Sequence, residues 1–89
     1  MTEKEKFKRM LKKYPSLRGF WKEIEGNFDT KGASVAVGLS PSELVILKCL
    51  SSIWGGASNG NDVDFTDIAA LSIEDRKPLV EFLVNPFWP

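Results

Sequence analysis

The sequence predicts an all-α fold, a small single-domain bundle of four to five short helices over residues 1–89. Two observations support this class. Apolar residues recur at spacings of three and four through the first 28 residues, which is the period of one α-helical face. Three later segments begin with residue types that cap helices, at Ser40, Asp64 and Ser72. The chain of 89 residues, 43% of them hydrophobic, is sufficient for one modest core.

Residues 1–28 are predicted to form a basic N-terminal helical arm. Its apolar face consists of Phe7, Met10, Leu11, Tyr14, Leu17, Phe20, Trp21, Ile24 and Phe28. Pro15 interrupts this face because proline lacks a backbone N–H and disfavours helical geometry at the residue before it. We therefore expect two helices, at about residues 3–14 and 16–26, or one helix with a sharp bend. Gly26 and Asn27 are typical of a helix end.

A helical core is predicted over residues 39–84. Before it, Val35, Val37 and Leu39 alternate with small residues, which indicates a short extended segment near residues 33–38. The core then opens on a capping box, in which Ser40 and Glu43 satisfy each other's backbone amides and Pro41 occupies the first helical position. The helix from Pro41 to about Trp54 is apolar nearly all round, so we expect it to be the central element.

Two shorter helices are predicted after the turn-rich link GGASNGN. Asp64 caps the first, from Phe65 to Leu71, and Ser72 opens the second, which ends before Asn85. The apolar stripe of the second helix is Leu79, Val80, Phe82 and Leu83. Pro78 leaves two possible starts for this helix. In a helix beginning at Ile73, Pro78 would remove one backbone hydrogen bond, whereas in a helix beginning near Arg76 it would be tolerated in the first turn. The aromatic tail, residues 85–89, is expected to fold Phe87 and Trp88 back onto the core.

The stretch from Gly55 to Leu71 resembles half of a calcium loop of the EF-hand type. Val63, Asp64 and Asp67 fit the eighth, ninth and twelfth positions of such a loop. The same register places Gly56 and Gly60 where oxygen ligands are needed, and Asn61 where the loop requires glycine. We therefore interpret the stretch as a linker that feeds a capped helix. Weak calcium binding by Asp62, Asp64 and Asp67 is the alternative.

Composition argues against several classes of function. The chain has no histidine and one cysteine, Cys49, which removes Ser-His and Cys-His nucleophiles and any disulfide within the chain. There is no phosphate-binding glycine motif, and no apolar run approaches the ~20 residues of a membrane span. We therefore expect a cytoplasmic protein, of bacterial or phage origin given its brevity, that is not an enzyme. It is expected to need no cofactor or metal and to have no small-molecule substrate.

Charge is distributed unevenly along the chain. Residues 1–31 carry nine Lys or Arg against five Asp or Glu, a balance of +4, and residues 32–89 carry three against seven, a balance of −4. Such polarity permits head-to-tail association, and it makes the N-terminal arm the segment where a nucleic acid could dock. The basic residues concerned are Lys4, Lys6, Lys8, Arg9, Lys12, Lys13, Arg18 and Lys22. A solvated helix face explains the same pattern.

The segments LSPSELVILKCL and DFTDIAALSIEDRKPLVEFL resemble the opening helix and helix-turn-helix of winged-helix regulators, over about residues 39–84. The resemblance implies a DNA-binding function. Ser72 stands in place of the usual turn glycine, Pro78 lies in the candidate recognition helix, and the charges of that helix sum to −1. Because a phosphate-facing surface should be positive, DNA binding is the alternative hypothesis.

The preferred hypothesis is a non-catalytic protein–protein interaction module whose partner is another protein or a second copy of the chain. Three tryptophans, six phenylalanines and a tyrosine are many large side chains for one small core, so some are expected to be shared with a partner. The apolar contact residues are predicted to be Trp21, Trp54, Phe87 and Trp88, and the charged rim Lys8, Lys12 and Lys13.

Overall fold

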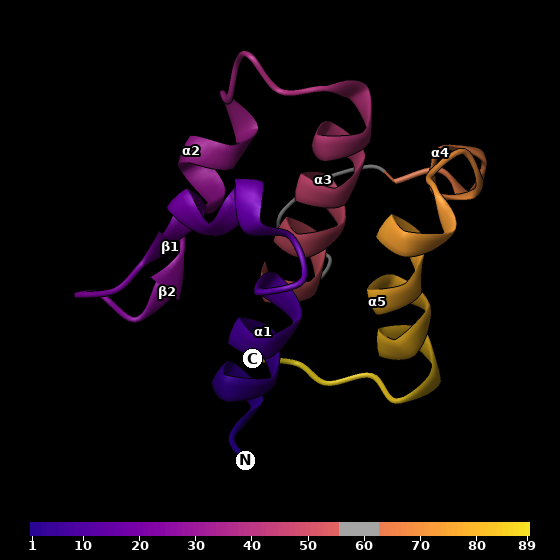
Figure 1. Cartoon of the computed structure of the whole chain (residues 1–89). Coiled ribbons are helices and arrows are strands. Elements are labelled where there is room, and N and C mark those ends of the chain that lie inside the picture. Colours follow the sequence, from indigo (N-terminus) through magenta and orange to yellow (C-terminus); the bar gives the residue numbers. More distant parts are fainter. Residues whose placement is uncertain (56–62) are drawn as a thin grey trace.

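The computed structural model describes residues 1–55 and 63–89. Within these two ranges the chain forms six helices and one two-stranded antiparallel sheet (Figure 1). The prediction of a small, mostly helical fold is therefore confirmed, with the sheet as an addition. Helix α3 (Pro41–Gly55) lies in the middle of the molecule, between the sheet on one side and helix α5 (Ile73–Val84) on the other (Figure 1).

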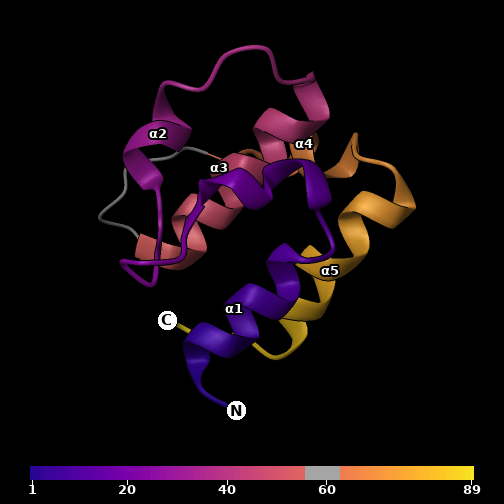
Figure 2. The same ribbon diagram turned by 60° about the vertical axis from the view of Figure 1, so that its left-hand side comes forward.

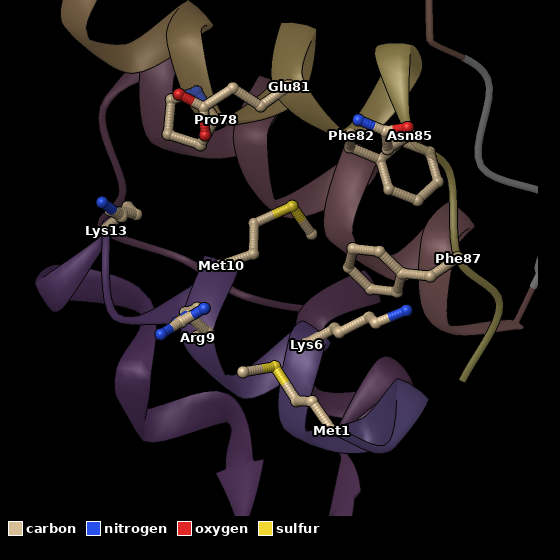
Figure 3. A pocket seen from close by; sticks show the side chains of 10 residues that line it. All are labelled: Met1, Lys6, Arg9, Met10, Lys13, Pro78, Glu81, Phe82, Asn85 and Phe87. Carbon is tan, nitrogen blue, oxygen red and sulfur yellow. The ribbon is translucent and has the colours of Figure 1, made fainter.

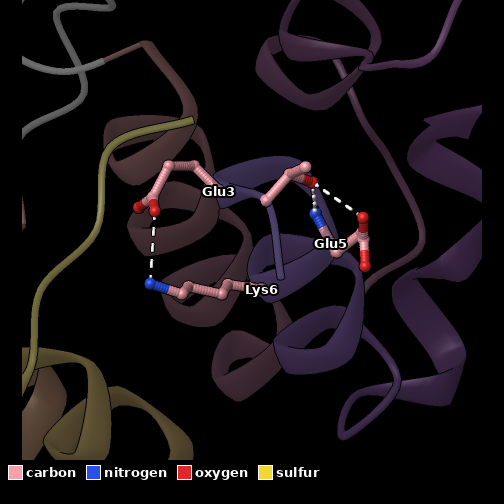
Figure 4. A network of polar contacts seen from close by, with 4 residues as sticks. Glu3, Glu5 and Lys6 are labelled. Atoms are coloured by element: carbon pink, nitrogen blue, oxygen red, sulfur yellow. Dashed lines mark hydrogen bonds and ion pairs between the residues drawn. The ribbon is translucent and has the colours of Figure 1, made fainter.

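Helix α1 (Glu3–Leu11) begins at the N-cap residue Thr2. The Thr2 hydroxyl accepts the backbone N–H of Glu5 at 3.1 Å and donates to the Glu5 carboxylate at 3.2 Å (Figure 4). The helix ends at Leu11, three residues earlier than predicted, and Tyr14 has non-helical angles of φ −125° and ψ 73°. Since Tyr14 precedes Pro15, this is the restriction that proline imposes on its neighbour.

The prediction of a second helix at residues 16–26 is wrong beyond Phe20. A 3-10 helix, η1 (Pro15–Phe20), is followed by strands β1 (Trp21–Lys22) and β2 (Asn27–Phe28). The two strands pair in an antiparallel register that places Trp21 opposite Phe28.

The turn between the strands explains this difference. Gly26 has a φ of +66° and donates its N–H to the Lys22 carbonyl at 2.8 Å, so it turns the chain back within the hairpin. Ile24, predicted for the apolar helix face, is 98% exposed near the hairpin tip. Because Trp21 and Phe28 are partners across the strands, the hairpin brings both toward the core without helical spacing.

The extended segment predicted at residues 33–38 is also wrong. Helix α2 (Thr30–Ser34) occupies its beginning and is capped by Asp29, whose carboxylate accepts the Gly32 N–H at 2.9 Å. The chain from residue 35 to the start of α3 is irregular, and Val35 and Val37 are exposed. The alternation of these valines with small residues therefore does not mark a strand. The segment is a surface connection, and it pairs with no described strand.

Helix α3 (Pro41–Gly55) confirms the predicted capping box and the predicted central helix. The Ser40 N–H donates to the Glu43 carboxylate at 2.9 Å, and the Glu43 N–H donates to the Ser40 hydroxyl at 3.2 Å. Six of its residues are buried, which are Ile46, Leu47, Cys49, Leu50, Ser51 and Ile53. The helix packs against η1, α2 and α4.

Of the last two helices, the first starts where predicted, at Phe65, but ends at Ala69, two residues before the predicted end at Leu71. Helix α4 (Phe65–Ala69) is capped by Asp64, and α5 (Ile73–Val84) by Ser72, whose hydroxyl accepts the Asp75 N–H at 3.1 Å. Of the two starts left open for α5, the structure has the earlier one. Pro78 therefore lies inside the helix, where it is buried against the core.

The core joins both ends of the chain. Its buried residues are Phe7, Met10, Leu11, Tyr14, Leu17, Phe28, Ile46, Leu47, Cys49, Leu50, Ile53, Leu71, Leu79 and Phe82. The buried Tyr14 hydroxyl donates to the Asp75 backbone carbonyl at 2.7 Å, which links the end of the N-terminal segment to α5. As Figures 1 and 2 show, α1 and α5 lie side by side although they stand at opposite ends of the sequence.

Candidate interaction surface

Trp21 and Trp54, two of the residues predicted to contact a partner, are together in an aromatic cluster. Their rings lie 5.5 Å apart at 86°, in edge-to-face geometry. Both also contact the fully buried Phe7, with ring centroids 6.2 Å from Trp21 and 5.1 Å from Trp54. Both tryptophans are partly buried, so much of their apolar surface is already used inside the molecule.

Lys8, predicted for the charged rim, binds the hairpin. Its ammonium group lies 3.6 Å from the Glu23 carboxylate and 5.5 Å from the Trp21 ring centroid. Both side chains of the ion pair are largely exposed, so the pair contributes little to stability. Lys12 and Lys13 are exposed in the turn after α1. Lys13 also lines a cavity, and Phe87 lines the opposite side of that cavity (Figure 3).

Phe87 and Trp88 both contact Phe82 of α5. Their ring centroids lie 5.1 Å and 5.5 Å from that of Phe82, both close to perpendicular. Phe87 is partly buried against the core, as predicted for a tail that folds back. Trp88 is 63% exposed and keeps one edge contact with Phe82. The structure thus brings these two residues together on Phe82.

Helix α5 carries exposed apolar residues that sequence reasoning missed. The predicted stripe of Leu79, Val80, Phe82 and Leu83 is divided, because Leu79 and Phe82 are buried while Val80 and Leu83 are exposed. Val84 is exposed as well. We call Val80, Leu83, Val84 and Trp88 the C-terminal surface. The available signal was that five of the six residues from 79 to 84 are apolar, more than one core-facing side of a helix can bury.

A groove of about 310 Å³ adjoins the C-terminal surface. Its walls come from α3, α4, α5 and the tail, and they include Cys49, Ile53, Ile68, Val80, Leu83 and Trp88. Large exposed apolar side chains beside a groove are characteristic of binding surfaces. The C-terminal surface is therefore the candidate site of this molecule.

The acidic residues of the calcium alternative have structural roles where they are described. Asp64 accepts the Thr66 N–H at 3.1 Å, and this bond holds the pKa of its carboxyl below the usual range. Asp67 follows in the first turn of α4, where a negative charge favours the helix dipole. Asp62 lies outside the described residues. Across residues 1–55 and 63–89, no three acidic or cysteine side chains converge as a metal site would require.

Cys49 lies in the groove wall but is poorly suited to nucleophilic chemistry. Burial raises the pKa of its thiol to about 11, and the negative charge of Asp67 adds to this. Since the thiolate is the reactive form, the side chain is protonated at neutral pH and behaves as a small apolar group.

Comparison with protein-family models, with curated proteins and with solved structures finds no match for this chain. The described helices include none that is both long enough and apolar enough to cross a bilayer. The resemblance to winged-helix regulators stays a prediction.

Proposed function

We propose that this protein is a non-catalytic interaction module that binds another protein molecule through the C-terminal surface. The observation that carries the proposal is the exposure of its four large apolar side chains, which is 48% for Val80, 62% for Leu83, 70% for Val84 and 63% for Trp88. Apolar side chains grouped in this way gain free energy when a partner removes them from water. Tryptophan is also among the residues that contribute most at protein interfaces.

A second copy of the chain is the first candidate partner. By helical spacing, Val80, Leu83 and Val84 share one side of α5. If two α5 helices pack antiparallel about a twofold axis near residue 82, Val80 of each copy lies opposite Val84 of the other, and both Leu83 side chains lie near the axis. Each copy would then remove the exposed apolar side chains of the other from water.

Sedimentation velocity over a concentration series tests this arrangement. The sedimentation coefficient of the wild-type protein is expected to rise with concentration, and Leu83→Glu should remove the rise by placing a charge in the apolar contact. Ile24→Glu is the matched control, since it introduces the same charge at the 98% exposed hairpin tip and should assemble like wild type. Equal assembly of the two variants would show that the C-terminal surface is not the interface. A wild-type protein that stays monomeric would exclude the second copy and leave a different protein as partner.

A further inference from the structure

A second cavity, of about 590 Å³, lies between α1 and α5, with the tail at its side (Figure 3). Its volume falls in the range of small-ligand pockets, roughly 300–1,000 Å³. The apolar part of its lining consists of Met1, Met10, Pro78, Phe82 and Phe87. Three of these belong to or contact the core, so a ligand with an apolar body would meet side chains that are already fixed in place.

The charged lining is predominantly cationic. Lys6 and Arg9 from α1 and Lys13 from the following turn line the cavity, and Glu81 is the acidic residue among its lining side chains. Lys6 is paired with Glu3 at 3.2 Å (Figure 4). The other two cations take part in none of the ion pairs found in residues 1–55 and 63–89. Arg9 and Lys13 are therefore available to bind an anion.

Polar groups lie on both sides of the cavity. In Figure 3, Arg9 and Lys13 lie on one side of Met10, and Phe82 and Phe87 lie on the other, where Lys6 and Asn85 are also found. A guanidinium group binds a carboxylate through two parallel hydrogen bonds, and a nearby ammonium group adds attraction. We propose that this cavity binds an apolar monocarboxylate of the medium-chain fatty acid type, with its carboxylate at Arg9 and Lys13 and its apolar chain toward Phe82 and Phe87. The proposal does not rest on a protein partner, although the cavity shares Phe82 with the groove beside the C-terminal surface.

The test is a titration of the full chain with decanoate, followed by NMR of ¹³C-labelled methionine methyl groups. Met10 should show a saturable shift, because it lies on the path between the two sides of the cavity. Decyltrimethylammonium has the same apolar chain with the opposite charge and should give no saturable shift at the same concentrations. Equal binding of the two ligands, or no shift with decanoate, would overturn the proposal.

Three variants assign the charges. Arg9→Glu should weaken decanoate binding by roughly tenfold or more, because it removes a charge-assisted hydrogen bond and adds a repulsion. Arg18→Glu is the control, since Arg18 is exposed on η1 and does not line the cavity, and it should leave the affinity unchanged. Glu81→Gln should tighten binding by roughly twofold to fivefold, because it removes the opposing carboxylate. This gain cannot come from loss of folding. Equal weakening by Arg9→Glu and Arg18→Glu, or no gain from Glu81→Gln, would contradict the site.

Discussion

Replacing Phe7 by alanine is predicted to remove a large part of the stability of the fold. Phe7 is 0% exposed and its ring contacts Trp21, Phe28 and Trp54, so its loss leaves a cavity between α1, the hairpin and α3. A buried Phe→Ala change costs about 3–5 kcal/mol. A domain of 89 residues has a total free energy of unfolding of roughly 4–13 kcal/mol. The variant is therefore expected to lose from about a quarter to all of this free energy.

Phe65→Ala is the matched control for this prediction. It deletes the same atoms, but Phe65 is 82% exposed at the start of α4, so the expected cost is within about 0.5 kcal/mol. Urea unfolding followed by far-UV circular dichroism gives both values. Tryptophan fluorescence is unsuitable, because Phe7 contacts two of the three tryptophans directly. If the two variants lost the same stability within about 1 kcal/mol, the aromatic cluster would not be the core described above.

Three further predictions concern individual groups. Tyr14→Phe removes the buried hydrogen bond to the Asp75 carbonyl and should cost about 1 kcal/mol in urea unfolding, with unchanged stability as the contradicting result. Burial raises the pKa of the Tyr14 hydroxyl, and the pKa of the Cys49 thiol to about 11 from 9.0. The unfolded chain therefore loses these protons at lower pH than the folded one, so stability should fall as the pH rises above about 9, and Cys49→Ala should reduce the slope between pH 9 and 11. Ser40→Ala breaks the capping box with Glu43 and should lower the thermal midpoint by an amount equivalent to about 0.5–2 kcal/mol, whereas Ser42→Ala should have little effect.

Helix starts could be predicted from the sequence because capping is local. Ser40, Asp64 and Ser72 each accept a backbone N–H two or three residues ahead, so the residues that decide the helix start lie within one turn of it. Pro15 likewise restricts Tyr14 locally, but α1 ends at Leu11, three residues before the predicted end. The capped helix starts needed no knowledge of tertiary packing.

The segments that were predicted wrongly depend on contacts distant in sequence. Phe20, Trp21 and Ile24 have helical spacing, but the pairing of Trp21 with Phe28 and the left-handed Gly26 turn produce a hairpin instead. Periodicity cannot distinguish these outcomes, because both bring Trp21 to the core. The alternation of Val35 and Val37 was similarly ambiguous, since a strand forms only where a partner strand is available.

The candidate site was predictable in part. The tail residues Phe87 and Trp88 were identified from their surplus aromatic character, and the structure places Trp88 at the groove. The sequence could not show that Trp21 and Trp54 pack against each other, because their contact joins residues 33 positions apart through Phe7. Nor could it divide the apolar residues of α5 into buried and exposed sets, since that depends on which side of the helix faces α1 and α3.

Site-specific photo-crosslinking in the cells that natively produce the protein tests the central proposal most directly. A photoreactive phenylalanine derivative would replace Leu83 in one variant and Ile24 in the other, both exposed positions. If the C-terminal surface binds a protein, light should join position 83 to a defined partner, at twice the mass of the chain for a second copy, while position 24 gives only background. Equal adduct yields from the two positions, or none from position 83, would contradict the proposal.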